Sequence, residues 1–500
     1  MIVGVDIGTQ SLKVSVLDLK LRVGGRSARG YQPNYPRPGW VEQDPRLWEN
    51  ALGPTIAEAL DASGASASEV LAIGLCGQLD GCIAVDADCV PLSNCLTWMD
   101  RRASAEIADV PADLIRQQCG LVLDPSHLAA KARWLKRHLA ADRPIARFHQ
   151  PVSYLVERLT GVAVIDHALA STSMGYALDS RDYDSALLGR FELLPEELPE
   201  IAGAECLAGG LTEIGAAVTG LPRGLPVAVG TGDDFATPLG GGLVSPGRIA
   251  VVLGTGEVVG GLHATALRDE GGLVETHAYP GGGFFIENPG WLSGGALAWL
   301  ASTLGITDFT AMDAAAAGVA PGAEGLRFIP ALTGAMAPEW RPSARGCFYG
   351  LTPSHGRGHL IRAVLEGCAF AMRDVVTHMV NMGVAADSLL LLGGGARSGI
   401  WAQMRADIAG RPVDVPSCDD SAPVGAAILA AVAGGLIDDL ATAAASRGGD
   451  SVRLVPDRGL NDIYEAAYDN YRRLFGCLTH VFEDTPSGRV DSPFKRGLGI

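Results

Sequence analysis

The chain has 500 residues, which is too many for one hydrophobic core, so at least two domains are expected. Its composition, 48% hydrophobic and 19% charged, is that of a compact soluble protein and excludes a disordered one. A formal net charge of −17 argues against a nucleic-acid or membrane partner, because both bind to clustered Lys and Arg.

The N-terminus reads MIVGVDIG, a strand pattern with no basic segment before it. No apolar run approaches the roughly 20 residues that a membrane span needs. The ten cysteines include no C-x-x-C pair and no His partner at zinc-finger spacing, so they predict neither zinc nor a redox motif. Small buried thiols are typical of a reducing compartment, and we expect a cytoplasmic protein.

Two β-rich runs, residues 2 to 7 and 12 to 19, open the chain, and the turn Gly8-Thr9-Gln10-Ser11 between them predicts a hairpin. From Ile249 the stretch IAVVLGTGEVVGGLHA repeats the order of strand, Gly-Thr turn and strand. Such a long repeat predicts two related domains, each beginning with a hairpin whose turn faces the other domain across a cleft.

The stretch from Pro222 to Gly247 is rich in Gly and Pro, which indicates a connection between domains. We place the boundary there, which gives domains 1–245 and 246–500. Strands and helices alternate elsewhere, as where a buried strand at 388–392 precedes three glycines and a helix. This alternation predicts an α/β fold.

Glycine-rich turns are candidate phosphate sites, because glycine lets backbone N–H groups approach an anion closely. A single Gly-Thr turn is more often only a hairpin, but its duplication here favours a ligand site. The segment Gly393-Gly394-Gly395-Ala396 follows a strand and opens a helix, a context in which ligands approach helix N-termini. It does not match G-x-G-x-x-G, and a plain strand-helix connection stays open at this point.

Longer motifs identify a family. The stretch GCFYGL (346–351), followed after seven residues by HLIRAVLE (359–366), resembles the C-terminal signature of the FGGY carbohydrate kinases, and SHLAAKARWL (126–135) resembles their N-terminal signature. Further matches run in family order: DIGTQSLK (6–13), PGWVEQDP (38–45), WMDRRA (98–103), GTGDDFA (230–236), GGGARSGIWAQMRADIAGRPV (393–413) and SAPVGAAILAA (421–431). The resemblance covers nearly the whole chain and is greatest to xylulokinases.

This resemblance implies two actin-like or ribonuclease H-like ATPase domains with a catalytic cleft between them. It implies ATP and Mg²⁺ as cofactors and transfer of the γ-phosphate to a hydroxyl of a ketopentose such as xylulose. Members of the family are often dimers, so a homodimer is expected, although no stretch of this chain marks an interface.

Within the resemblance, Asp233 matches the catalytic carboxylate. A hydroxyl is a poor nucleophile at neutral pH, so a base that accepts its proton assists phosphoryl transfer. Asp234 stands where relatives usually have Asn or Gln, and we expect it to contact the substrate or a backbone amide. Neighbouring carboxylates raise one another's pKa unless an extended chain points them apart. The alternative is that both aspartates cap the following element.

Asp6 matches the acidic residue that holds Mg²⁺, and the preference of this ion for carboxylate and water oxygens fits that role. The family's second turn is usually G-T-S-G, and Glu257 departs from it. A glutamate beside a triphosphate is unfavourable unless it points away or reaches the metal. The residues that the resemblance assigns to the nucleotide are Gly8, Thr9, Gln10, Gly254, Thr255, Gly394, Gly395 and Ala396.

Acceptor contacts are expected mainly from the first domain. Xylulokinases have Met-His where this chain has Leu79 and Asp80, and an aspartate still accepts two hydroxyl hydrogen bonds. Trp98 resembles a residue that lines the sugar pocket, although packing in the core is the alternative. The expected substrate residues are Gln78, Leu79, Asp80, Trp98, Asp100, Arg101, Asp233 and Asp234.

Glycerol or another polyol is the alternative acceptor, since the A-P-x-W spacing of APEWRP (337–342) is closer to glycerol kinase. From a different class, the same fold hosts actin-like and Hsp70-like ATPases that bind partner proteins according to their nucleotide state. A non-catalytic sugar sensor is disfavoured because Asp6 and Asp233 are both present.

Overall fold

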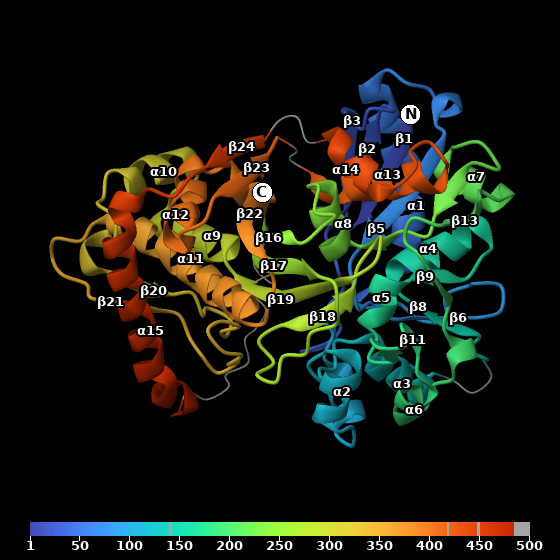
Figure 1. The fold of residues 1–500 in the computed structure, drawn as a ribbon. Helices are drawn as coiled ribbons and strands as arrows, with labels where there is room; N and C mark the ends of the chain where they lie inside the picture. Colours follow the sequence, from blue (N-terminus) through green and yellow to red (C-terminus); the bar gives the residue numbers. More distant parts are fainter. Residues whose placement is uncertain (140–142, 418–419, 448–450, 485–500) are drawn as a thin grey trace.

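The computed structural model describes residues 1–139, 143–417, 420–447 and 451–484. Two mixed sheets of seven strands form two halves of the molecule, the N-terminal half on the right and the other on the left in Figure 1. Among the described helices, none combines the length and the apolar composition that a bilayer crossing requires.

The first sheet is built on the predicted hairpin. Strands β1 (Ile2–Ile7) and β2 (Ser11–Leu17) pair antiparallel, and β5 (Ala72–Gly77) lies parallel to β1 on its other side. The order is β13-β14-β5-β1-β2-β3, with β15 also paired to β5. The remaining strands are β3 (Val23–Gly30), β13 (Leu207–Gly210), β14 (Pro226–Ala228) and β15 (Thr231–Gly232).

The second sheet repeats this arrangement in the order β18-β19-β17-β16-β22-β23-β24. Strands β16 (Gly247–Leu253) and β17 (Gly256–His263) form the second hairpin, and β22 (Ala386–Leu392) lies parallel to β16 as β5 does to β1. The predicted duplication and the α/β fold class are therefore confirmed. The other strands are β18 (Glu275–Ala278), β19 (Phe284–Leu292), β23 (Val413–Pro416) and β24 (Ser451–Leu454).

Helices cover both sheets. The first half of the sequence contributes α1 (Pro45–Ser63), α2 (Ala112–Cys119), α3 (Leu128–His138), α4 (Pro151–Thr160), α5 (His167–Ser171), α6 (Ser185–Arg190), α7 (Glu213–Thr219) and α8 (Asp233–Gly240). The second contributes α9 (Gly294–Leu304), α10 (Phe309–Ala317), α11 (Arg357–Asn381), α12 (Gly399–Ala409), α13 (Ser421–Ala433), α14 (Leu440–Arg447) and α15 (Asn461–Asp484). The described part of the chain also contains five short strand pairs: β4 (Glu42–Gln43) with β7 (Cys95–Leu96), β6 (Ile83–Val85) with β8 (Arg147–His149), β9 (Val164–Asp166) with β12 (Glu200–Ala202), β10 (Tyr176–Ala177) with β11 (Asp182–Tyr183), and β20 (Arg327–Ile329) with β21 (Cys347–Tyr349).

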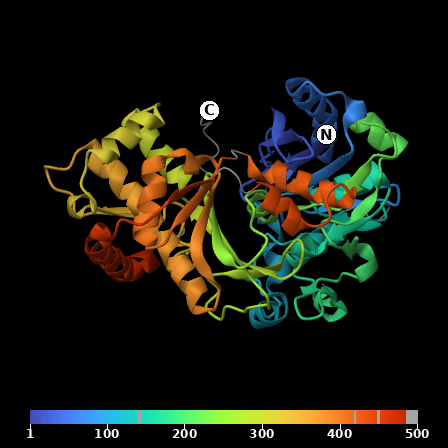
Figure 2. The same cartoon turned by 45° about the horizontal axis from the view of Figure 1, so that its top comes forward.

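Helix α13 lies on the first sheet although it comes late in the sequence, as Figures 1 and 2 both show. It packs on β1, β5 and α8. Glycines allow this close approach, because a Cβ at Gly4 would overlap the carbonyl oxygen of Pro423, and one at Gly425 that of Ala236. The predicted division at 245/246 falls between the two sheets. Because α13 comes after this division in the sequence but packs on the first sheet, neither half of the molecule is one continuous segment of the chain.

This contact makes a prediction about stability. We expect Gly4→Ala to destabilise the protein by about 2 kcal/mol or more, because overpacking typically costs about 1–3 kcal/mol and the obstacle here is backbone. Gly24→Ala in β3 is the matched control, since its Cβ would make only ordinary contacts. Urea unfolding measures both variants, and equal midpoints for the two would contradict the packing described.

Candidate active site

Three parallel strands bring candidate catalytic residues to one edge of the first sheet. Strands β1 and β15 both lie parallel to β5. Asp6 is the penultimate residue of β1, Gln78 follows β5, and Asp233 follows β15 as the first residue of α8. A Cβ at Gly232 would touch the side chain of Leu79, so the segment after β5 lies against the segment that carries Asp233.

Asp233 and Asp234 lie in the first turn of helix α8, and neither occupies the N-cap, which is Gly232. Burial raises the pKa of Asp233 to about 6, although the backbone N–H groups at the start of the helix oppose this. Burial and then the charges of Asp233 and Asp80 raise the pKa of Asp234 well above its usual range. The two aspartates were expected to point apart along an extended chain, but they lie at the start of a helix. Because its pKa is raised less, Asp233 loses its proton at lower pH than Asp234.

Asp6 lies beside a lysine that sequence reasoning missed. Lys13 Nζ is 3.9 Å from Asp6 Oδ2 and 3.3 Å from Asp420 Oδ1. Burial and then the charge of Asp233 raise the pKa of Asp6 to about 8, while Lys13 acts in the opposite direction. The signal for Lys13 was present in the hairpin, because the register of its turn puts Lys13 directly opposite Asp6.

Side chains from three other segments hold the first Gly-Thr turn. Tyr31 Oη donates a hydrogen bond to Gly8 O at 2.7 Å, and Gln43 Nε2 donates to Thr9 O at 2.6 Å. Trp98 Nε1 donates to Thr9 Oγ1 at 3.0 Å. Trp98 is 45% exposed, so it is not a core residue, and its position beside the turn favours the functional interpretation.

Gln78 and Gln10 differ in their surroundings. Gln78 is buried, and its Nε2 donates to Gln43 Oε1 at 2.7 Å. Since Gln43 also holds Thr9, the end of β5 is tied to the first turn. Gln10 is exposed at the tip of that turn, and its carbonyl oxygen accepts a hydrogen bond from Tyr31 N at 2.9 Å.

Two further predicted acceptor residues are engaged in ion pairs. Asp100 is fully buried, accepts a hydrogen bond from Val41 N at 2.7 Å, and bonds through both oxygens to the Arg102 guanidinium. It therefore holds the loop that carries Trp98, which differs from the expected contact with the acceptor. Arg101 pairs with Asp124.

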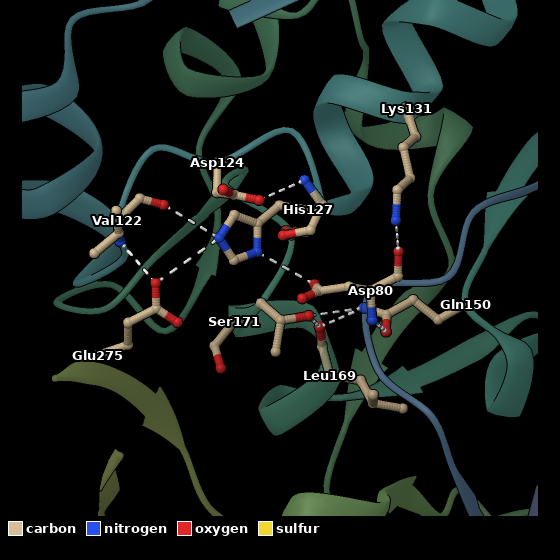
Figure 3. A network of polar contacts seen from close by, with 12 residues as sticks. Asp80, Val122, Asp124, His127, Lys131, Gln150, Leu169, Ser171 and Glu275 are labelled. Atoms are coloured by element: carbon tan, nitrogen blue, oxygen red, sulfur yellow. Dashed lines mark hydrogen bonds and ion pairs between the residues drawn. The ribbon is translucent and has the colours of Figure 1, made fainter. Parts of the chain in front are cut away.

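Asp80 is the centre of a polar network (Figure 3). Its backbone has a φ of +57°, its N–H donates to Gln150 Oε1 at 2.9 Å, and its carbonyl oxygen accepts from Lys131 Nζ at 2.7 Å. His127 Nδ1 lies 3.3 Å from Asp80 Oδ1. Burial alone would lower the pKa of His127. The charge and hydrogen bond of Asp80, together with the charge of Glu275, have the larger effect and raise the pKa of His127 to about 9. The Asp80 carboxylate is thus held by an imidazolium.

The side chain of Glu257, the residue that differs from the expected G-T-S-G pattern, points away from the second Gly-Thr turn toward Arg405. Its carboxylate is fully buried and receives two hydrogen bonds from Arg405 of α12, at 2.5 Å from Nη1 and 2.7 Å from Nη2. The glutamate charge is therefore paired inside the second half. It does not stand beside the phosphates that the Gly-Thr turn is expected to bind.

The predicted nucleotide residues of the second half lie together, because β16 and β22 are parallel neighbours. The Gly-Thr turn follows β16, and the glycine-rich segment forms a short 3₁₀ turn, η5 (Gly394–Arg397), after β22. Thr255 O accepts a hydrogen bond from Gly295 N at 2.9 Å, so helix α9 begins on the same turn. The residues gathered at these strand ends are Gly254, Thr255, Gly394, Gly395 and Ala396.

Among the described residues, one mixed cluster has metal-ligand composition. Cys89, His149 and Glu157 are buried, with ligand atoms within 4.8 Å of one another. His149 Nε2 lies 2.7 Å from Glu157 Oε2, and Arg147 Nη2 lies 2.7 Å from Glu157 Oε1. Both carboxylate oxygens therefore already have nitrogen partners, and an ion-pair network accounts for the cluster.

Two related mixed sheets, each with a Gly-Thr turn and the first with carboxylates at its strand ends, form a two-domain α/β ATPase fold. Solved kinases have this fold. The structure of a xylulose kinase from Rhodospirillum rubrum has a TM-score of 0.87, is 30% identical, and aligns over 96% of this chain and 99% of that one.

Family models match both halves of the chain. The N-terminal domain of the FGGY family of carbohydrate kinases matches residues 1–240, and the C-terminal domain matches 249–434. The chain therefore belongs to the FGGY family of carbohydrate kinases, and the predicted family is confirmed.

Individual relatives include two kinds of kinase. A glycerol kinase from Gloeobacter violaceus is 32% identical over 485 residues, which cover 94% of this chain and 95% of that protein. A xylulose kinase from Escherichia coli K12 is 31% identical over 439 residues, covering 87% and 90%. The chain is thus a sugar kinase in the broad sense, and its similarity does not choose between these acceptors.

Proposed function

We propose that the protein transfers the γ-phosphate of ATP to a hydroxyl of a ketopentose such as xylulose. Glycerol or another polyol is the second candidate, because glycerol kinases are as similar in sequence. The observation that carries the proposal is the half-buried Asp233 carboxylate at the start of α8, at the edge of the sheet where β1 carries Asp6 and leads into the first Gly-Thr turn.

Asp233 has the properties of a general base. With a pKa near 6 it is ionised at neutral pH and still basic enough to accept a proton in the transition state. As the acceptor oxygen bonds to the terminal phosphorus, the bond from that phosphorus to the bridging oxygen of ADP breaks, and the hydroxyl proton passes to Asp233. The proton then leaves to solvent, and the products are the phosphate ester and ADP.

The end of β1 fits a magnesium ion. Asp6 is buried, and its Oδ1 has no hydrogen-bond partner in the described part of the chain. Magnesium prefers carboxylate and water oxygens, so Asp6 would hold it, and the ion would neutralise charge on the transferred phosphoryl group. Burial lowers the pKa of Lys13, but Asp6 and Asp420 outweigh this and raise it, so Lys13 stays cationic and attracts phosphate despite the negative net charge.

The acceptor is identified by measuring ADP release from purified enzyme and ATP. Each ketopentose or polyol is added in turn, and a reaction without any of them gives the background rate. We expect turnover to depend on the acceptor, with xylulose giving the highest kcat/KM. ATP turnover that no sugar or polyol increases would overturn the proposal and favour an ATPase that binds a partner protein. Light scattering on the same sample tests the expected homodimer.

The raised pKa of Asp233 predicts an acid limb in the pH profile. Protonation removes the base, so kcat/KM is expected to fall about tenfold for each pH unit below about 6 and to level off above it. An ordinary aspartate, with a pKa of 3.8, would keep full activity to much lower pH. The measurement is a rate profile with tryptophan fluorescence as the check on folding, and a flat profile down to about pH 5 would contradict the prediction.

A further inference from the structure

Two glutamates face each other across the edge strand β18 of the second sheet and its neighbour β19. Glu275 of β18 is the cross-strand partner of Glu287 of β19, and they are 7% and 3% exposed. Like charges directly opposite on an antiparallel pair are destabilising, and burial of the two carboxylates adds to the cost. Such local conflicts occur at functional or strained positions.

This face of the sheet meets the first half of the molecule. Glu275 Oε1 accepts a hydrogen bond from Val122 N at 2.8 Å and lies 3.9 Å from His127 Nε2. Figure 3 shows Glu275 and Asp80 on opposite sides of the His127 ring. The second sheet therefore reaches the network that holds Asp80, a predicted acceptor residue.

A ring contact joins the same face to the start of α8. His277, two residues along β18 from Glu275, shares its face of the sheet. The His277 ring packs edge-on against Phe235, with ring centroids 5.5 Å apart. Since Phe235 directly follows Asp233 and Asp234, the glutamate pair borders the proposed base as well as Asp80.

Polar atoms on this face are left without partners. Glu287 Oε2 and His277 Nδ1 are buried and have no hydrogen bond to any described residue. Burial, and then the charges of Asp234 and Glu275, raise the pKa of Glu287 well above its usual range. Burial lowers the pKa of His277 to about 4, so its ring is neutral. Buried polar groups are almost always satisfied, so the missing partners point to a ligand.

We propose that Glu287 and Glu275 bind the end of the acceptor that is not phosphorylated and select an uncharged hydroxyl there against a carboxylate or phosphate. The proposal rests on the proposed kinase function and adds the charge class of its acceptor. A hydroxyl both donates to a carboxylate and accepts from a protonated one, so it satisfies either state of the pair. An anionic group would face the two acid side chains and the neutral His277 ring, because the nearby cation, His127, is already paired with Asp80.

The test compares acceptors that differ only in CH₂OH against COO⁻: glycerol with glycerate, and xylitol with xylonate. In the wild type we expect kcat/KM for the alcohol to exceed that for the acid by about 10³-fold, since like-charge juxtaposition costs several kcal/mol. Glu287→Gln removes charge without changing shape. This variant is expected to raise KM for the alcohol about tenfold and to leave kcat within about threefold of the wild-type value. The ratio of kcat/KM for the alcohol to kcat/KM for the acid is expected to decrease at least tenfold.

Glu275→Gln is the second variant, and Glu270→Gln, an exposed glutamate on the preceding loop, is the matched control. Equilibrium binding of the better alcohol without ATP, followed by tryptophan fluorescence, gives a readout besides activity. Both variants are expected to bind the alcohol more weakly, and the control is expected to match the wild type. The thermal midpoint of Glu287→Gln should equal or exceed that of the wild type, because this change relieves a like-charge pair.

The outcomes separate this inference from the kinase function. Acceptor-dependent turnover with the same alcohol-to-acid ratio and the same binding in wild type and both variants would overturn the role of the glutamates alone. A wild type that phosphorylates the acids as well as the alcohols would do the same. Turnover independent of every acceptor would instead remove the proposed function on which the inference rests.

Discussion

Replacing Asp233 by asparagine is expected to lower kcat by about 10³-fold, within the range of about 10²–10⁴ that a general base contributes. The amide keeps the size of the side chain and its place at the start of α8, but it cannot accept the hydroxyl proton. KM for the acceptor is expected to stay within about threefold, because the loss falls on the transition state. Steady-state kinetics with coupled ADP detection measures both parameters.

Asp234→Asn is the matched control, since it places an amide one residue further along the same helix turn. It is expected to keep kcat within about fivefold, because the proposed base remains. Equal losses in the two variants would show that the helix start, and not one carboxylate, is what the reaction needs. Retention of more than a tenth of the activity by Asp233→Asn would overturn its assignment as the base.

Replacing Arg405 by methionine is expected to destabilise the protein by about 3–5 kcal/mol, because it leaves Glu257 as an uncompensated buried charge. Both side chains are fully buried, so water does not screen the loss. Urea unfolding gives the change in free energy. Because Glu257 is at the start of β17, directly after the second Gly-Thr turn, the affinity for a non-hydrolysable ATP analogue is expected to fall as well.

The double variant, Glu257→Met with Arg405→Met, distinguishes the effect of an unpaired charge from the effect of changed side-chain packing. Replacing both charges by apolar groups of similar volume is often neutral or stabilising, so most of the lost stability is expected to return. Arg373→Met, which breaks a partly exposed pair with Glu465, is the control and is expected to cost no more than about 1 kcal/mol. A double variant as unstable as Arg405→Met would contradict this account of the ion pair.

The backbone of the candidate site could be predicted because its signals are local. Glycine and threonine between two β-rich runs predict a hairpin, and the repetition of that pattern predicts two related sheets. Asp6 and Asp233 sit beside such strands in the sequence, and parallel pairing with β5 brings their strand ends to one edge.

Side-chain partners could not be predicted in the same way, because they come from distant segments. The direction of Glu257 depends on Arg405, which lies on α12, and Asp100 accepts a hydrogen bond from Val41, 59 residues before it. Lys13 is the exception, since counting back from the turn would have placed it opposite Asp6.

The glutamates of β18 and β19 also gave no signal in the sequence. The strands read ETHA and FFIENPGWL, and neither alternates polar with apolar residues, so the sequence assigns neither glutamate to a buried or an exposed face. Their burial comes from packing between the sheet and the first half, at Val122 and Phe235.

The return of α13 to the first sheet has a consequence for synthesis on the ribosome. The glycine-lined surface of β1 and β5 stays uncovered until residue 433 has been translated, roughly 10 to 40 s after residue 245 at about 5–20 residues per second. During that interval the N-terminal segment lacks the helix that closes its core, and limited proteolysis of a chain ending at residue 245 would reveal the open surface. Folding of the first half therefore waits for translation of most of the second.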